Sequence, residues 1–283
     1  MDFYQKLLGI NKMPTETETY GEVRSSLVYS PFDEGLEILA GLNENLISIP
    51  ENAQLRIISG PNSRVSRNGN WTREGILYVP RGKPRLVRNS PILFSAKEAT
   101  EAHGQGREFY PSKDAIEQAL VDSVEFPSSN TEISTNGLAD NSFTVYALGG
   151  EEQARAYGEF LRQAGINNLP VWVVGQDSVN SQDNTFVRQM WFRSLVGRSG
   201  LVGDGRDLHY VDGLRGVSRR TSEAGSQDLP GFVKGLTNEE IARILYPTTF
   251  ALRSQLEVAI MTQDYELAAR LRDRINLTDE PLK

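Results

Sequence analysis

The sequence predicts an α+β protein that consists of several parts. Residues 23–94 contain short runs rich in β-branched and aromatic residues, separated by turn sequences with Gly, Pro or Asn. Residues 111–220 combine strand-like runs with helical spacing of apolar residues, whereas the spacing after residue 232 is helical. We therefore expect a β-rich unit over 1–110, a mixed domain over 111–220 and a helical segment over 232–283.

The composition indicates a globular protein and limits its chemistry. Of 283 residues, 39% are hydrophobic and 24% are charged, which is typical of soluble domains. The chain has no cysteine, and its histidines are His103 and His209, so disulfides and thiolate metal sites are excluded and a histidine-rich metal centre is disfavoured. We expect no cofactor and no metal, although a calcium site made of oxygen ligands stays open.

The N-terminus shows no signal-peptide pattern, and no apolar run is long enough to span a bilayer. We expect no membrane partner. The expected location is the cytoplasm, or a phage or viral particle assembled there.

The first 110 residues are expected to form a small β-rich unit. A short amphipathic start with Phe3, Leu7 and Leu8 leads into the polar sequence TETETYGE, which is typical of a linker. The sequence RNGN at 67–70 predicts a hairpin turn, because Asn-Gly tolerates positive φ angles. The expected strands are the runs SSLVYS, LISIP, QLRIIS, GILYVP and PRLVRN.

Basic residues concentrate between Arg56 and Arg88. Glu74 is the one acid in this segment, so the segment is locally about +7 by counting, in a chain of net charge −7. Such a cluster can meet the phosphates of a nucleic acid or an acidic partner. The alternative is a set of solvated strand faces whose cations pair with acids elsewhere in the chain. The cations are Arg56, Arg64, Arg67, Arg73, Arg81, Lys83, Arg85 and Arg88.

The middle part begins with a predicted helix in the sequence PSKDAIEQALVDSV, where Ser112 is a candidate N-cap. The clearest helix is GGEEQARAYGEFLRQAG, which has acids in its first turn and Gly165 as a stop signal. The flanking sequences FTVYAL and PVWVVG are typical of strands. The apolar face of the second helix is formed by Ala154, Tyr157, Phe160 and Leu161.

The sequence contains no strong catalytic motif. GDGR at 203–206 lacks the third glycine of a phosphate-binding loop, and GRSG around Ser199 lacks the glycine spacing of a serine-hydrolase turn. A set of Ser199, His209 and an aspartate stays open on residue types alone. The carboxylates of Asp204, Asp207 and Asp212 could act as acid and base, but neighbouring arginines favour a salt-bridged surface. These arginines are Arg198, Arg206 and Arg215.

The stretch from Trp191 to Val217 has a narrow set of residue types. Residues 193–220 contain no Lys, Glu, Gln, Met or Trp. Regularly placed Trp, Leu and Arg residues predict a buried frame, namely Trp191, Leu201, Leu208 and Arg215. Each residue predicted to lie in the loops is of a type that an Asn codon reaches when only its adenines change. These loop residues are Ser194, Val196, Gly197, Gly200, Val202, Asp204, Gly205, Asp207, His209, Tyr210, Val211 and Gly213.

The run from FVRQMWFRSL to RSGLVGDGRDLHYVDGLRGV resembles the variable region of the target proteins of diversity-generating retroelements. In that family a reverse transcriptase miscopies template adenines and so rewrites Asn codons. The resemblance covers about residues 125–220 and implies a C-type lectin-like domain. It also implies that the loop residues form a diversified ligand-binding face, on which His209 and Tyr210 are expected contacts. The chain departs from the family in continuing more than sixty residues beyond Val217 and in having no basic residue directly after it.

The C-terminal sequence LRSQLEVAIMTQDYELAARLRDRI resembles the UVR motif, a helical hairpin of bacterial excision-repair subunits and of adaptors in protease systems. Such a short hairpin buries too little surface to be stable alone, so it is expected to dock on another surface. The alternative is a hairpin that only closes the fold. The matching residues are Leu252, Leu256, Ala259, Asp264, Tyr265, Glu266, Ala268, Ala269, Leu271, Arg272, Asp273 and Ile275, of which Asp264, Tyr265, Arg272 and Asp273 are the expected partner contacts.

Together these features predict a ligand-binding protein and not an enzyme. The expected ligand is a protein of unknown identity, because a broad varied patch suits a surface better than a small pocket. The alternatives are a UVR-type adaptor that recruits a repair or proteolytic machine, and a nucleic-acid binder that uses residues 56–88. The sequence leaves open whether the chain is a monomer or a homo-oligomer.

Overall fold

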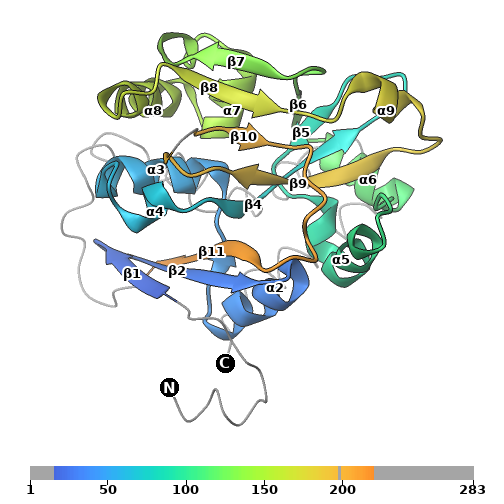
Figure 1. Cartoon of the computed structure of the whole chain (residues 1–283), viewed down its shortest axis with the longest axis horizontal. Helices are drawn as coiled ribbons and strands as arrows, with labels where there is room; N and C mark the ends of the chain where they lie inside the picture. Colours follow the sequence, from blue (N-terminus) through green and yellow to red (C-terminus); the bar gives the residue numbers. More distant parts are fainter. Residues whose placement is uncertain (1–15, 197–198, 220–283) are drawn as a thin grey trace, which may run out of the picture. The chain divides into compact units, whose positions relative to one another are not determined.

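The computed structural model describes residues 16–196 and 199–219, and these belong to one compact unit that ends at Arg220. The amphipathic start at Phe3 and the expected helices after residue 232 lie outside the described residues. Within the described part, eleven strands form one sheet (Figure 1). The path through the sheet is β1 (Glu16–Tyr20), β2 (Val23–Ser30), β11 (Asp212–Arg219), β4 (Asn70–Tyr78), β9 (Phe186–Phe192), β10 (Leu201–Val202), β8 (Asn168–Trp172) and β7 (Thr131–Ser134).

Three short strands pair off this path. β3 (Asn45–Leu46) pairs with β11, while β5 (Arg85–Val87) pairs with β4 and with β6 (Ser123–Glu125). The sheet is almost entirely antiparallel, and β11 meets β4 through a single parallel pair, Leu214 with Trp71. Figure 1 shows the consequence, with β1, β2 and β11 set apart from the larger group that contains β4 and β9.

The expected boundary at residue 110 falls inside this sheet. β4 precedes residue 110 and pairs with β9, which follows it, and β2 pairs along its whole length with β11. Strands from both sides of the boundary therefore share their backbone hydrogen bonds, so residues 1–110 and 111–220 are not separate units in the described structure.

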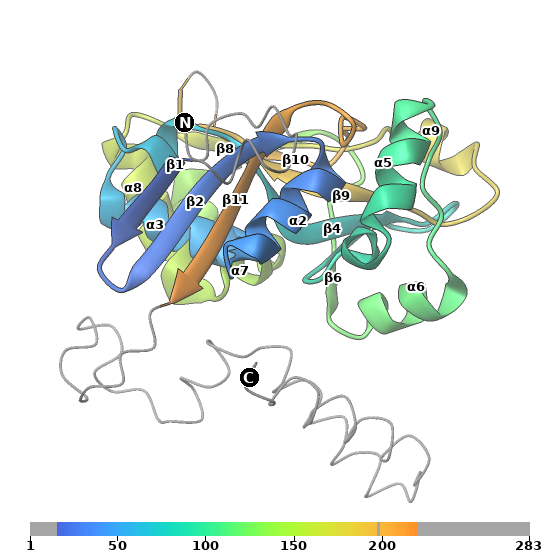
Figure 2. The same cartoon turned by 90° about the horizontal axis from the view of Figure 1, so that it is seen from below.

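Two large hydrophobic cores and a smaller one pack against the sheet, and the smaller one consists of Ile47, Leu55, Val65 and Val217. In the first, α3 (Ile49–Ser59), α7 (Ser142–Leu148) and α8 (Glu151–Gln163) pack against strands that include β8 and β9. In the second, α2 (Phe32–Gly41) and α5 (Ala96–Gly104) pack near β4 and β11. Figure 2 shows α3, α7 and α8 on one side of the unit and α5 on the other. The remaining short helices are α4 (Arg64–Arg67), η1 (Pro91–Phe94), α6 (Lys113–Leu120), η2 (Thr135–Gly137) and α9 (Gln176–Asn180).

Several predicted elements are confirmed. α8 buries the predicted residues Ala154, Tyr157 and Leu161, and Gly165 follows it with a φ of 78°. α6 begins at the predicted N-cap, because the Ser112 side chain accepts a hydrogen bond from the backbone of Ala115. The runs SSLVYS, GILYVP, PRLVRN and PVWVVG contribute to β2, β4, β5 and β8.

Other predictions for the first 110 residues were wrong, because the described part of this segment has more residues in helices than in strands. QLRIIS lies in α3, which starts at a capping box formed by Ser48 and Glu51. TETETYGE is not a linker, because it forms β1 and the turn to β2, with Gly21 at a φ of 61°. RNGN is not a hairpin turn, because Arg67 ends α4 and Asn70 begins β4.

FTVYAL is also helical rather than extended. It forms most of α7, whose first turn is capped by the Asn141 side chain and whose end is marked by Gly149 in the left-handed conformation. Both capping residues lie outside the apolar run, so the run read alone favours a strand although its flanks specify a helix.

Candidate functional site

The stretch from Trp191 to Val217 contains the end of β9, all of β10 and most of β11. Residues 193–200 connect β9 with β10, and residues 203–211 connect β10 with β11. Three residues of the predicted frame are fully buried: Leu201 in the first core, Leu208 in the second, and Arg215 beneath β1 and β2. Trp191 is half-buried and packs edge-on against Trp71, with ring centroids 5.0 Å apart. The frame residues therefore anchor both loops to the rest of the unit.

Of the predicted loop residues that the structure describes, five are exposed, four are half-buried and two are buried. Val196, Tyr210 and Val211 expose 63%, 58% and 49% of their surface, which is high for apolar side chains of this size. Gly197 lies outside the described residues. We call the remaining solvent-accessible set the loop face: Ser194, Val196, Val202, Asp204, Gly205, Asp207, His209, Tyr210 and Val211.

Gly200 and Gly213 do not belong to the loop face. A Cβ atom on Gly200 would collide with the indole of Trp172 and would lie 2.7 Å from the carbonyl oxygen of Pro170. A Cβ on Gly213 would lie 2.8 Å from the carbonyl oxygen of Gly69. Backbone cannot yield as a flexible side chain can, so the prediction that these two positions accept other side chains requires correction.

The main chain of the two loops is held by groups outside the loop face. Gly203 is fixed on both sides, since its N–H donates to the Trp172 carbonyl at 2.8 Å and its carbonyl accepts from the Tyr78 hydroxyl at 2.9 Å. Burial raises the pKa of Tyr78, which keeps this hydroxyl a donor. Three further contacts hold the loops: Leu195 N–H to Ser66 O (2.7 Å), Phe32 N–H to Leu208 O (2.8 Å) and Arg188 Nη1 to Asp204 O (2.6 Å).

Val202 of the loop face belongs to a row of cross-strand neighbours. Val202 of β10 pairs with Trp172 of β8 on one side and with Trp191 of β9 on the other, and Trp191 pairs with Trp71 of β4. Cross-strand partners project from the same side of a sheet, so all three tryptophans of the chain share one row. The guanidinium of Arg193 lies 5.0 Å from the Trp172 ring centroid. Sequence reasoning missed Trp172, because only strand pairing brings it to Val202.

The acids of the loop face are not salt-bridged to described residues as predicted. Arg206 instead approaches Glu108 at 3.6 Å, and Arg215 approaches Glu18 at 3.6 Å. Partial burial raises the pKa of Asp204 and of Asp212, and the nearby charge of Asp207 adds to both shifts. Asp204 and Asp207 form no salt bridge within residues 16–196 and 199–219, although the Arg188 guanidinium lies against the Asp204 main chain and opposes the rise in the pKa of its carboxyl group.

The predicted contacts His209 and Tyr210 lie side by side, with ring centroids 4.0 Å apart. His209 packs against Gly104 at the end of α5, whereas Ser199 is fully buried and precedes Gly200 beside Trp172. No hydrogen bond joins Ser199 and His209 in the described structure. No group of three or more metal-ligating side chains is found in the described part of the chain.

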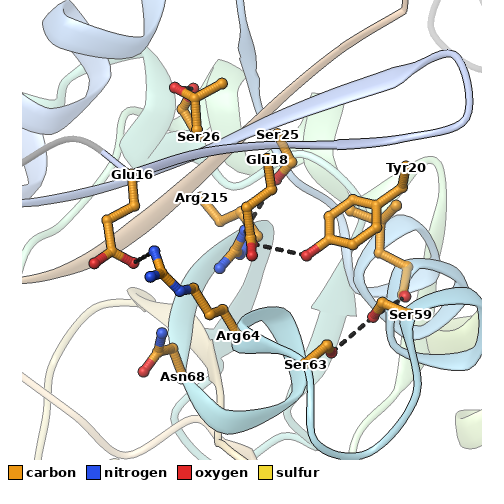
Figure 3. A network of polar contacts seen from close by, with 12 residues as sticks. Glu16, Glu18, Tyr20, Ser25, Ser26, Ser59, Ser63, Arg64, Asn68 and Arg215 are labelled. Carbon is orange, nitrogen blue, oxygen red and sulfur yellow. Dashed lines mark hydrogen bonds and ion pairs between the residues drawn. The ribbon is translucent and has the colours of Figure 1, made fainter.

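Figure 3 shows how Arg215 is held under the hairpin of β1 and β2. Its Nη1 donates to the Ser25 hydroxyl at 3.1 Å and approaches Glu18, which in turn accepts from the Tyr20 hydroxyl. Burial lowers the pKa of Arg215. Nearby, Arg64 pairs with Glu16 at 2.9 Å. The end of the variable stretch is therefore tied to the first described strand.

The basic residues between 56 and 88 do not all face solvent. Arg56 is fully buried and lies over the Phe192 ring, while Lys83 pairs with Glu125 and Arg88 approaches Asp122 at 3.5 Å. This arrangement matches the alternative of cations paired with acids elsewhere. A nucleic-acid or acidic partner at this segment stays a prediction, which a steep salt dependence of binding would support.

None of the helices in the described residues is both long enough and apolar enough to cross a membrane. Comparison with protein families finds the UVR family (UvrB/uvrC motif) at residues 251–277, which lie outside the described residues. The motif includes the predicted contacts Asp264, Tyr265, Arg272 and Asp273. Among curated proteins no match is found.

One solved structure that is similar to this fold comes from Nanoarchaeota, where the C-type lectin fold accommodates massive sequence variation. It aligns with a TM-score of 0.51 and 19% identity over 71% of this chain and all of that chain. The described unit is therefore similar to a C-type lectin fold, as the resemblance implied. The identity is too low for the comparison to show more than the fold.

Proposed function

We propose that the protein binds a protein ligand through the loop face, and that a retroelement diversifies the residues of this face. The observation that carries the proposal is the separation between side chains and main chain in the two loops. Val196, Tyr210 and Val211 are exposed, whereas the main chain is held by Ser66, Trp172, Tyr78, Phe32 and Arg188. Side chains can therefore change on this face without loss of the contacts that shape it.

The chemistry of the loop face favours a protein ligand. Tyr210 offers a large contact area at a low cost in side-chain entropy, Asp204 and Asp207 offer carboxyl groups, and Val196 and Val211 offer exposed apolar surface. These side chains come from the two loops that flank β10. Such a mixture of aromatic, apolar and polar groups is typical of protein interfaces.

The diversification is tested by sequencing this locus across a natural population. We expect substitutions to concentrate at the loop-face codons and to yield residues that an Asn codon reaches through its adenines. Leu201, Leu208 and Arg215 should stay unchanged, together with Gly200 and Gly213. Substitutions scattered evenly along residues 16–219 would contradict the proposal.

Binding is tested with a displayed library of the full chain in which the loop-face codons are randomised. Selection against a single probe protein, hen egg-white lysozyme, should return binders from this library. The matched control randomises exposed helix positions away from the face, namely Lys113, Glu117, Glu152, Arg155 and Glu159. Equal recovery from both libraries would show that the loop face has no special capacity for binding.

A second function is favoured by the UVR match at residues 251–277. We infer that this segment recruits a partner protein, such as a repair subunit or an unfoldase. The test compares pull-downs with the full chain and with a Tyr265→Ala/Arg272→Ala double variant. Loss of one specific partner from the variant supports recruitment, and an unchanged set of partners contradicts it.

A further inference from the structure

Arg188 connects three parts of the unit through one guanidinium. It belongs to β9 and is 3% exposed. Its Nε and Nη2 donate to the two carboxylate oxygens of Glu108 at 2.7 and 2.5 Å, and its Nη1 donates to the Asp204 carbonyl at 2.6 Å. Such a two-pronged contact of arginine with a carboxylate fixes the guanidinium in position and direction.

Glu108 adds a second link between the same segments. It follows α5, and its carboxylate also lies 3.6 Å from Nη1 of Arg206. The same Nη1 donates to the Gly106 carbonyl at 3.1 Å. Residues 106–108 and 204–206 are thus joined by charged groups, and hydrogen bonds to charged groups are stronger than those between neutral groups.

The atom that Arg188 holds is present in every residue type. The acceptor at position 204 is the backbone carbonyl, whereas the Asp204 side chain is exposed. Neither Arg188 nor Glu108 belongs to the loop face. A substitution at 204, 205 or 207 therefore leaves both the guanidinium and its acceptor in place.

We propose that Arg188 and Glu108 are positioning residues that fix the main chain around residue 204, whichever side chains the loop face carries. This inference rests on the proposed function, in which those side chains vary. The pair acts through the backbone carbonyl of residue 204, so it positions the loop face and makes no contact with a ligand.

The first test is amide hydrogen exchange in the full-length protein with Glu108→Gln and with Arg188→Lys. Lysine keeps the charge, but it lacks the planar group that lets Arg188 donate twice to Glu108 and once to the residue 204 carbonyl. We expect exchange in residues 204–210, read at the Tyr210 N–H that donates to the Asp207 carbonyl, to become about ten-fold faster, because the main chain of the loop loses a bond to a charged group. Exchange in the core strand β4 should stay unchanged, and a uniform increase over the whole unit would reduce the pair to a general stabiliser and overturn the proposal.

Glu44→Gln is the matched control. Glu44 is also a buried carboxylate beside an arginine, Arg24, and it accepts from the backbone N–H of Ser26 at 3.1 Å. This variant should accelerate exchange near Ser26 and leave residues 204–210 unchanged. Faster exchange at 204–210 in this control would mean that the loop responds to any loss of a buried charge.

A charge swap distinguishes the contact of Arg188 with the residue 204 carbonyl from a simple ion pair between residues 188 and 108. The double variant Arg188→Glu/Glu108→Arg restores opposite charges but leaves position 188 without a donor for the residue 204 carbonyl. We expect the loop to exchange as fast as in Glu108→Gln. Recovery of the original protection would overturn the proposal, and if the swap does not fold, Arg188→Lys carries the same comparison.

The second test measures tolerance to substitution in the loop. A panel of loop-face variants at 204, 205 and 207 is melted in the original background and in the Glu108→Gln background. We expect melting temperatures to differ by about 2–4 °C within the original panel and by clearly more in the Glu108→Gln panel. Equal spread in both would overturn the proposal. Neither test needs a ligand, so an absence of natural variation would remove the proposed function and leave these results standing.

Discussion

Gly200 lies so close to Trp172 that the indole ring occupies the space of a Cβ atom at residue 200. The contact holds Gly200 against β8, and the Gly200 carbonyl also accepts from the N–H of Arg193, which follows β9, at 2.9 Å. We expect Gly200→Ser to lower the free energy of unfolding by about 2 kcal/mol, as overpacking of a filled site does.

The comparison for this variant is Gly205→Ser. A Cβ at Gly205 would have its nearest neighbour at 3.5 Å, which is ordinary contact. Urea unfolding should place Gly205→Ser within about 0.5 kcal/mol of the original protein. Equal losses from the two serine variants would show that Gly200 is not specially constrained.

The exposed apolar side chains of the loop face should be replaceable. Val196→Asn, Tyr210→Asn and Val211→Asn each replace a side chain of which about half or more is already exposed to water, so we expect changes within about 0.5 kcal/mol in thermal or urea unfolding. Leu208→Asn is the contrast, because it buries an amide in the core and should cost more than about 2 kcal/mol. A loss of that size in any of the three exposed variants would argue against a replaceable face.

Local patterns in the sequence were sufficient where a local rule decides the structure. The helix of residues 151–163 has a regular apolar face, and the frame residues Leu201 and Leu208 could be recognised as buried by their spacing among small polar residues. Most of the loop face followed from the same contrast. These features depend on near neighbours in the chain.

The features that could not be predicted from the sequence depend on contacts between distant parts of the chain. The pairing of β2 with β11 joins residues almost two hundred positions apart, so no local pattern indicates that these two strands are neighbours in the sheet. Gly200 and Gly213 resemble replaceable loop glycines until the backbone and ring beside them are known. Arg188 and Glu108 are ordinary charged residues in the sequence and acquire a role only through the fold.

Arg215 should be essential for stability, because it is fully buried and ties β11 to the first hairpin. Arg215→Ala removes its hydrogen bond to Ser25 and leaves Glu18 without its cation, which we expect to cost about 3 kcal/mol in urea unfolding. Arg64→Ala is the control, since its ion pair with Glu16 is mostly exposed and should be worth less than about 1 kcal/mol. Similar small losses from both variants would contradict a structural role for Arg215.

The buried carboxyl group of Glu74 should make stability depend on pH. Burial raises its pKa to about 7 in the folded protein, where Oε2 accepts from the Ile49 N–H at 2.9 Å. Between its ordinary pKa of 4.5 and about 7, the folded state holds a proton that the unfolded state has released. Stability should therefore fall as pH rises through this range, by up to about 3 kcal/mol, and then level off.

Glu74→Gln isolates this effect, because glutamine resembles the protonated carboxyl group and can still accept from Ile49. Buried His103 works in the opposite direction: burial lowers its pKa to about 3, so its contribution to stability rises with pH between about 3 and its ordinary value. His103 is present in both proteins, so its effect cancels in their difference. Urea unfolding from pH 4.5 to 8 should show equal stability at the acid end and a glutamine variant that is increasingly the more stable toward pH 7. Parallel curves for the two proteins would mean that Glu74 is ionised in the fold at every pH tested.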